Sequence, residues 1–192
     1  MSRIIAGSRK GHRLHTPAGD ATRPTSDRVR EAAFGVLASE LGRVGDPAVM
    51  LSGQGFLDLY AGSGAVALEA ASRGAASVVA VESDRRAAEV IRRNVADTRL
   101  GVRVVNTSVE RYLAGAPSEF ALCWLDPPYT VPGTTVAGVV ERLADHWLTT
   151  GGIVVVERSS RGGEFEWPAR LGDRWHRRYG ETTLYFAMEG EA

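Results

Sequence analysis

The sequence predicts a doubly wound α/β fold, in which a mostly parallel seven-stranded sheet is flanked by helices and ends in an antiparallel hairpin. Between residues 55 and 157, short apolar runs alternate with segments whose apolar residues recur at helical spacing, which is typical of a parallel sheet. A glycine turn, Gly62–Gly64, follows the first run, as in folds that bind nucleoside ligands. The last two runs, 174–179 and 182–188, are separated by only two residues, which indicates a hairpin.

Length and composition favour a single compact domain. The chain has 192 residues, of which 44% are hydrophobic and 24% charged, and this suits one domain with a sizeable core. Cys123 is the only cysteine, which excludes an internal disulfide framework and a cysteine-rich zinc site. No apolar run approaches the roughly 18–20 residues of a membrane span, and the first residues lack the apolar segment of a secretory signal. We therefore expect a cytoplasmic protein.

Basic residues are concentrated at the start of the chain. Through residue 30, seven arginines and lysines stand against two acidic residues, although the formal net charge of the whole chain is zero. We divide the chain into a basic N-terminal arm, residues 1–25, with short strands or a hairpin, and a second domain, residues 26–192. A cluster of this kind attracts phosphate groups, so the arm is a candidate phosphate-binding segment.

The remaining elements follow in order from the end of the arm. Ser26 or Thr25 is placed to cap a helix over residues 27–41, because the apolar residues of this range recur at helical spacing. A loop over residues 42–53 leads to the first strand, which reaches Asp58 before the glycine turn. The later elements are expected as strands 76–82, 102–106, 120–126 and 153–157, and as helices 85–95, 109–113 and 135–148.

The stretch around the glycine turn indicates a cofactor that contains a nucleoside. Gly62, Gly64 and Ala67 fit the pattern G-x-G-x-x-[GA]. Sites that bind NAD have the same pattern, so the glycine turn alone is also compatible with NAD. Glu82 follows Gly62 by 20 residues, where an acid would accept hydrogen bonds from ribose hydroxyls. Asp58 precedes the turn, where its carboxylate would repel a pyrophosphate and attract a cation. S-adenosylmethionine carries a sulfonium and an ammonium group and no phosphate, so Asp58 favours it over NAD.

A second motif, Asp126-Pro127-Pro128-Tyr129, follows the fourth strand of the parallel sheet. Open α/β sheets build their sites at this edge. The two prolines offer carbonyl acceptors without N–H donors, Asp126 adds a carboxylate, and Tyr129 adds an aromatic face. Such a cluster suits a planar base that is held by its exocyclic amine. We take these four residues, called the tetrapeptide below, as the candidate catalytic residues.

These motifs are similar to those of a known enzyme family. The stretch Asp58–Gly64, Glu82 and the tetrapeptide resemble the S-adenosylmethionine-dependent amino-methyltransferases of class I, which have a Rossmann-like fold. More narrowly, the segments Arg3–Gly7, Arg23–Glu31 and Tyr179–Leu184 resemble the bacterial 16S ribosomal RNA guanine-N2 methyltransferases of the RsmD type. The resemblance implies methylation of guanine 966 of 16S ribosomal RNA during assembly of the small subunit. Separately, we expect the enzyme to be a monomer.

The resemblance also implies roles for individual residues. Asp126 and the Pro127 carbonyl would hold the guanine amine, while Tyr129 would stack on a base taken out of the RNA stack. The family often has Asp or Asn just before the residue that faces adenine, whereas this chain has Ser108. The candidate cofactor-binding residues are Arg23, Thr25, Asp58, Tyr60, Ala61, Gly62, Gly64, Glu82, Ser83, Ser108 and Val109, and the candidate RNA-binding residues are Arg9, Lys10 and Arg13.

Other functions stay open from the residues alone. An N6-adenine DNA or RNA methyltransferase would share the tetrapeptide but not the N-terminal segment. An NAD-dependent oxidoreductase would fit the glycine turn and Glu82, but it would leave the tetrapeptide without a role. A non-catalytic RNA-binding assembly factor would retain the fold alone. The histidines lack ligand spacing with one another, so we expect no metal site.

Overall fold

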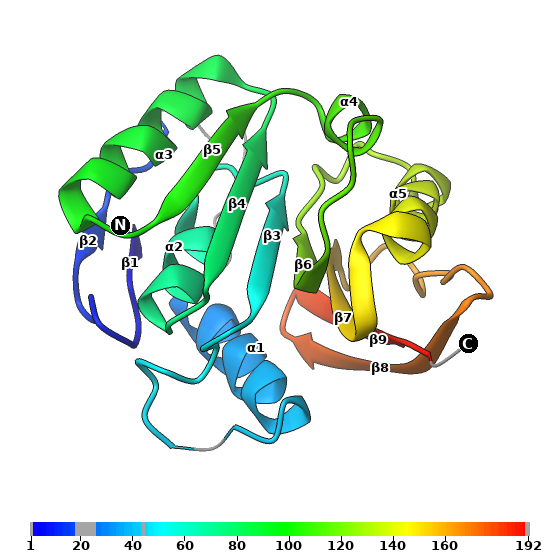
Figure 1. Cartoon of the computed structure of the whole chain (residues 1–192). Coiled ribbons are helices and arrows are strands. Elements are labelled where there is room, and N and C mark those ends of the chain that lie inside the picture. Colours follow the sequence, from blue (N-terminus) through cyan, green and yellow to red (C-terminus); the bar gives the residue numbers. More distant parts are fainter. Residues whose placement is uncertain (1, 18–25, 44, 191–192) are drawn as a thin grey trace.

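The computed structural model describes residues 2–17, 26–43 and 45–190, and its main feature is one seven-stranded sheet (Figure 1). The strand order is β5-β4-β3-β6-β7-β9-β8, and a separate ladder joins β1 to β2. The strands are β1 (Ser2–Arg3), β2 (Arg13–Leu14), β3 (Gly55–Leu59), β4 (Ser77–Glu82), β5 (Val102–Asn106), β6 (Phe120–Leu125), β7 (Leu148–Ser159), β8 (Leu171–Tyr179) and β9 (Thr182–Glu189). The helices are α1 (Asp27–Glu40), α2 (Ala65–Ser72), α3 (Arg85–Thr98), α4 (Val109–Leu113) and α5 (Gly133–His146).

The strand directions confirm the predicted topology. The strands from β5 to β7 run parallel to one another, while β9 is antiparallel to both β7 and β8. The chain builds outward from β3 through β4 to β5, and it then returns to place β6 on the other side of β3. Leu59 and Leu125, the last residues of β3 and β6, are paired. Open α/β sheets bind ligands at such a reversal, outside the carboxyl ends of the strands.

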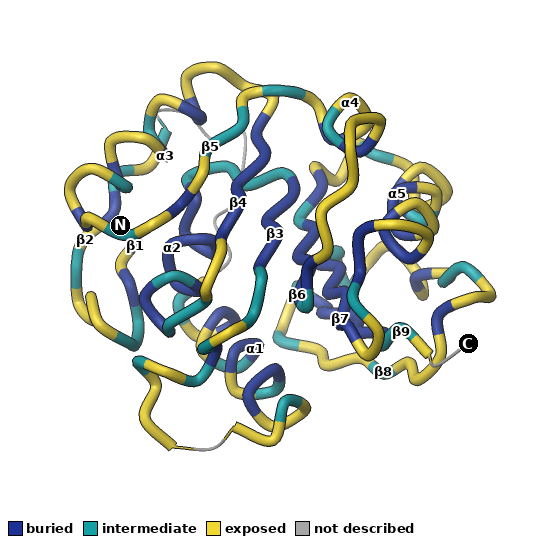
Figure 2. Tube along the Cα trace, in the orientation of Figure 1, coloured by how far each residue is buried: buried dark blue, intermediate teal, exposed yellow. Residues whose placement is uncertain are grey.

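Two hydrophobic layers cover the sheet, and the buried strands run between them (Figure 2). Phe34 of α1 and Ile91 of α3 belong to the first layer, together with Phe56 of β3. Leu143 of α5 belongs to the second layer, together with Leu57 of β3. Successive strand residues point to opposite faces, so β3 contributes to both layers. Among the described helices, none is both long and apolar enough to cross a membrane.

Several element boundaries differ from those predicted. β7 begins at Leu148 rather than at residue 153, and its first part passes through Gly151, whose φ is 71°. The pairing of β6 with β7 shifts register in this stretch, so a regular apolar alternation does not mark it. α3 continues to Thr98, beyond the predicted end at residue 95; its last buried positions are the polar Asn94 and Thr98, which an apolar pattern does not mark. α5 starts and ends two residues before the predicted range 135–148.

Residues 2–17 pack against α2 and α3 (Figure 1). β1 and β2 pair as the predicted hairpin. Ile4 is fully buried, and the N–H groups of Ile5 and Ala6 donate to the Glu69 carboxylate of α2 at 2.7 and 3.0 Å. This part of the arm therefore forms a surface of the folded domain. The arm boundary that we predicted at residue 25 lies outside the described residues.

Candidate functional site

The turn between β3 and α2 depends on glycine for its shape. Gly62 and Gly64 have φ angles of 54° and 76°, in the left-handed region that glycine adopts without strain. A Cβ atom on Gly64 would also lie 2.7 Å from Cγ2 of Ile91. Gly64 is the N-cap of α2 and offers no side-chain acceptor to the first N–H groups of the helix. The turn thus brings backbone donors close to any ligand that lies above it.

Asp58 lies beneath this turn. The residue is 1% exposed, and its Oδ2 accepts the N–H of Ala67 in the first turn of α2 at 2.9 Å. Burial raises the pKa of Asp58 to about 8, against the lowering effect of the Ala67 hydrogen bond, and the negative Glu82 raises it further. Burial therefore favours the neutral carboxyl group, so Asp58 offers a cationic ligand less negative charge than the sequence suggests. The structure shows Asp58 as a support of α2, and its contact with a cofactor stays a prediction.

Glu82, at the carboxyl end of β4, joins two turns. Its Oε2 accepts the N–H of Gly62 at 2.8 Å, and its Oε1 accepts the N–H of Asp84 at 2.7 Å. Glu82 therefore braces the glycine turn, a role that its position in the sequence does not reveal, in addition to the predicted ribose contact. Each carboxylate oxygen keeps a second lone pair, so the ribose contact remains chemically feasible and stays a prediction.

The other candidate cofactor residues lie at the same edge of the sheet. Ala61 follows β3, and its N–H donates to the carbonyl of Val81 at 3.0 Å. Ser83 directly follows β4 and is exposed. Ser108, after β5, caps α4 by accepting the N–H of Arg111, and the next residue, Val109, is buried. The structure therefore brings these residues together with the glycine turn. The remaining two, Arg23 and Thr25, lie outside the described residues.

Tyr60 has features that sequence reasoning did not detect. It has a φ of 62°, which is uncommon for a residue other than glycine. Its hydroxyl is buried and has no hydrogen-bond partner within the described part of the chain. Burial, with the nearby charge of Glu110, raises the pKa of Tyr60 to about 12. A protonated, unpaired donor therefore lies next to the glycine turn, at the end of β3.

The tetrapeptide begins directly after β6, next to the glycine turn. The N–H of Asp126 is 3.4 Å from the carbonyl oxygen of Leu59 in β3. Pro127 is buried, whereas Tyr129 is 58% exposed. The N–H of Val131 donates to the Pro128 carbonyl at 2.9 Å and closes a turn. The arrangement presents an aromatic ring at the surface, beside a carboxylate and the end of β3.

The candidate RNA-binding residues lie elsewhere. The N–H of Arg9 donates to Ser72 Oγ at 3.0 Å, and Arg9 Nε donates to the Thr98 carbonyl at 2.7 Å. Ser72 and Thr98 end α2 and α3, which run back toward the amino edge of the sheet. Arg9 and its exposed neighbour Lys10 are thus at the edge opposite the tetrapeptide. Arg13, in β2, is exposed and paired with Arg3 in the ladder.

A base that sequence reasoning missed lies close to the tetrapeptide. Arg158, near the carboxyl end of β7, donates from Nη2 to the Val131 carbonyl at 3.0 Å. Its position directly after the predicted fifth strand, 153–157, could have indicated that this arginine lies at the carboxyl edge of the sheet. Among the described residues, no group of three or more His, Cys, Asp or Glu side chains is arranged to hold a metal ion.

Comparison with known proteins places the chain in a family. The sequence matches the model of the family described as conserved hypothetical protein 95 over residues 2–188. Ribosomal RNA small subunit methyltransferase D of Escherichia coli K12 is 34% identical over 163 residues, which cover 84% of this chain and 76% of that protein. The same enzyme of Haemophilus influenzae is 28% identical over 162 residues, or 81% of this chain and 77% of that protein.

Solved structures agree with this assignment. A hypothetical protein of Thermus thermophilus superimposes with a TM-score of 0.78 and 34% identity, and the match covers 100% of both chains. A 16S rRNA N2 G1207 methyltransferase of T. thermophilus, solved with AdoMet and guanosine, shares the fold at 22% identity and a TM-score of 0.66, covering 90% of this chain and 44% of that chain. The chain therefore has the class I methyltransferase fold and belongs to the conserved hypothetical protein 95 family, a methyltransferase family that includes the ribosomal RNA small subunit methyltransferases D.

Proposed function

We propose that this protein transfers a methyl group from S-adenosylmethionine to the exocyclic N2 of a guanine in 16S ribosomal RNA, of the guanine 966 type. The observation that carries the proposal is the tetrapeptide, which follows β6 and lies beside the glycine turn at the carboxyl edge of the sheet. The relatives named as small-subunit rRNA methyltransferases support the class of substrate. The structural neighbour that was solved with AdoMet and guanosine, a 16S rRNA N2 G1207 methyltransferase, supports guanine as the base.

The residues of the site fit the cofactor. S-adenosylmethionine supplies an electrophilic methyl group on its sulfonium. A Cβ atom on Gly62 would meet nothing within 4 Å, so the space beside this glycine is open and permits close approach of a ligand to the backbone. Glu82 would accept from the ribose, and Ser108 and Val109 would border the adenine. Tyr60 would donate its unpaired hydroxyl to an acceptor of the bound molecule. Titration calorimetry should detect binding of S-adenosylmethionine and none of NAD, and comparable NAD affinity would contradict the cofactor assignment.

The tetrapeptide would position the guanine amine. The lone pair of this amine is delocalised into the ring, so the amine is a weak nucleophile. Asp126 and the Pro127 carbonyl would accept hydrogen bonds from its protons, which directs the nitrogen toward the methyl group. Positioning and charge stabilisation then supply most of the rate enhancement. The exposed ring of Tyr129 would stack on the base after it leaves the RNA stack. A strong base is not needed before transfer, since the amine becomes acidic only when it is methylated.

One experiment tests this function directly. The protein is incubated with S-adenosylmethionine labelled in the methyl group, and with either free 16S rRNA or partly assembled small subunits. Digestion of the RNA to nucleosides should then show label in N2-methylguanosine. Label in N6-methyladenosine would instead support the alternative function. The absence of transfer to either substrate would contradict the proposal, and comparison of the two substrates identifies the assembly state that the enzyme uses.

A further inference from the structure

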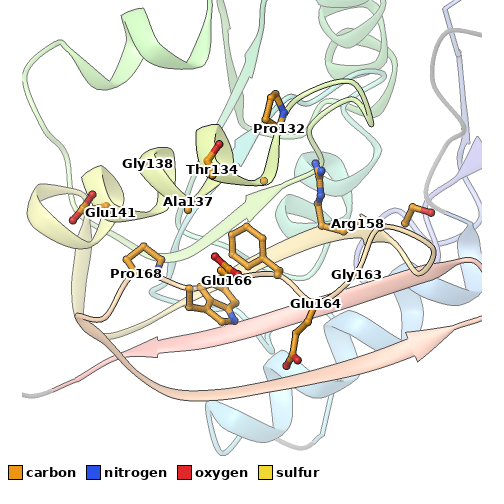
Figure 3. A pocket seen from close by; sticks show the side chains of 15 residues that line it. Pro132, Thr134, Ala137, Gly138, Glu141, Arg158, Gly163, Glu164, Glu166 and Pro168 are labelled. Atoms are coloured by element: carbon orange, nitrogen blue, oxygen red, sulfur yellow. The ribbon is translucent and has the colours of Figure 1, made fainter.

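A cavity of about 670 Å³ lies beside the candidate site, between α5 and the segment of residues 162–168 that connects β7 with β8 (Figure 3). Pro132, at the start of α5, and Ser159, at the end of β7, are among its lining residues. The cavity therefore reaches the carboxyl edge of the sheet. The described residues that line it do not include the tetrapeptide, so the cavity is separate from the proposed guanine position.

Arg158 connects this cavity with the tetrapeptide. Its Nη2 donates to the Val131 carbonyl, and the Val131 N–H donates to the Pro128 carbonyl. Its Nη1 is buried and has no partner within the described part of the chain. A buried donor without an acceptor is costly, so an occupant that brings an acceptor oxygen would be stabilised once the guanidinium turns to present Nη1 to the cavity.

Charge is divided along the cavity. Figure 3 shows Arg158 at the end near Pro132, and Glu141 at the other end near Pro168. α5 begins at the Arg158 end, and no side chain caps its N-terminus, so its free N–H groups add positive potential there. Glu166, which also lines the cavity, offers a carboxylate between the two ends (Figure 3). Glu164 also lines the cavity, next to Gly163 (Figure 3). Preference for an anion is therefore confined to Arg158 and the start of α5, and the rest of the cavity favours hydrogen-bond donors.

The wall of the cavity includes aromatic rings. Trp167 lines it and is half-buried, and Phe165 holds the indole in an edge-to-face contact with ring centroids 4.9 Å apart. An oriented indole is a stacking surface for a base. The cavity volume lies in the range of sites for small organic ligands, roughly 300–1,000 Å³.

We propose that this cavity binds a second nucleotide of the substrate RNA, next to the methylated guanine; this inference rests on the proposed function. The phosphate lies at the Arg158 end, the base stacks on Trp167, and Glu166 accepts a hydrogen bond from an exocyclic amine. The site therefore prefers adenine, cytosine or guanine over uracil. By gripping the neighbouring nucleotide, the cavity contributes to selection of the target guanine.

Gly138 allows a test that fills the cavity without disturbing the fold. Gly138 lines the cavity from α5, and a Cβ atom there would meet nothing within 4 Å. Leucine is a better helix former than glycine, so Gly138→Leu should fold well. We expect the variant to raise the KM for RNA about tenfold, the scale of one lost stacking contact. The kcat and the affinity for S-adenosylmethionine should stay unchanged. The matched control is Gly35→Leu in α1, an exposed helical position that is equally open.

Two further measurements separate the outcomes. Trp167→Phe, which retains a ring, should keep more RNA affinity than Trp167→Ala. An unchanged KM in Gly138→Leu on both free rRNA and small-subunit particles would overturn the proposal. Binding of free rRNA, measured by titration, should weaken in the same proportion as binding of particles; weakened binding of particles with unchanged binding of free rRNA would also overturn the proposal, because the occupant would then be a ribosomal protein. The wild-type enzyme tests the proposed function itself. If it transfers no methyl group to either substrate, the proposed function is contradicted. If it transfers the group and Gly138→Leu has an unchanged KM, only the cavity assignment is contradicted.

Discussion

At the scale of single residues, two carboxyl groups support the glycine turn in different ways. Glu82 accepts two backbone N–H groups, which compensates its burial. Within the described part of the chain, Asp58 accepts only that of Ala67, and its pKa is raised to about 8 because desolvation outweighs this hydrogen bond. For Asp58, burial and bonding to the charged form act on the pKa in opposite directions, and burial has the larger effect.

The raised pKa of Asp58 predicts how stability changes with pH. The folded-state value of about 8 exceeds the reference value of 3.8, so protonated Asp58 is favoured by folding. This contribution is fully present below pH 3.8 and is lost as the pH rises through about 8. Asp58→Asn cannot ionise, and its amide oxygen can still accept the Ala67 N–H. The thermal unfolding midpoint of Asp58→Asn should therefore rise relative to that of wild type as the pH rises from about 5 to about 9.

The exposed Asp173 of β8 provides a control for this measurement. Asp173→Asn should leave the pH dependence of the midpoint as it is in wild type. If the difference in midpoint between Asp58→Asn and wild type is the same at every pH, Asp58 does not titrate in the proposed way.

The tetrapeptide gives a second prediction at this scale. Asp126→Ala should lower methyl transfer on the order of a hundredfold, the effect of removing one positioned hydrogen-bonding group from a transition state. Cofactor affinity should remain near wild type, because the proposed partner of Asp126 is the guanine amine. Tyr129→Phe should be milder than Tyr129→Ala, since stacking requires the ring. Single-turnover rates and calorimetry measure the two quantities, and wild-type rates in Asp126→Ala would contradict the positioning role.

At the scale of elements, α2 organises the N-terminal hairpin. Glu69 of α2 is fully buried and accepts from two hairpin N–H groups, and Arg73 pairs with it at 2.7 Å. Ser72 donates to the Ala6 carbonyl and accepts from the Arg9 N–H. A buried ion pair is stabilising only when its remaining polar atoms are bonded, and the hairpin backbone supplies two of these bonds.

Gly7 is the tightest point of this contact. A Cβ atom on Gly7 would lie 1.9 Å from the Ser72 carbonyl oxygen, and its φ is 82°. Gly7→Ala should therefore displace the hairpin from α2 and destabilise the fold by about 2 kcal/mol or more. Gly11→Ala is the control, because Gly11 has a similar φ of 84° but nothing within 4 Å of a Cβ atom. Chemical denaturation should show a larger loss for Gly7→Ala, and equal losses would mean that backbone strain alone matters.

At the scale of the whole molecule, the two edges of the sheet carry different groups of candidate functional residues. The carboxyl edge carries the tetrapeptide, the glycine turn and the cavity beside Arg158. The amino edge carries Arg9 and Lys10, because Arg9 is bonded to the ends of α2 and α3. These bases therefore lie away from Tyr129, at the opposite edge of the sheet. Any contact that they make with RNA would be with a more distant part of the substrate.

This separation predicts which kinetic constant the arm affects. Replacing Arg9, Lys10 and Arg13 by alanine should weaken RNA binding and reduce its salt dependence by roughly 2–3 in slope, since each phosphate contact releases counterions. The kcat at saturating RNA should stay near wild type. Replacing the exposed Arg86, Arg92 and Arg93 of α3 is a control with the same change in charge. Wild-type affinity and salt slope in the arm variant would show that these bases are structural.

The sequence by itself determined the fold and the position of the motifs. Alternating apolar runs specify the strands, Ser26 caps α1 as predicted, and the glycine turn and the tetrapeptide each lie at the end of a strand. These features depend on residues close together in the chain and on the general rule that sites form at the carboxyl edge. The tertiary structure alone decided the protonation of Asp58, the bracing by Glu82, the docking of the hairpin on Glu69, and the cavity at Arg158. Each depends on burial or on contacts between distant segments, such as that of Ile5 with Glu69, 64 residues apart, for which local sequence carries no signal.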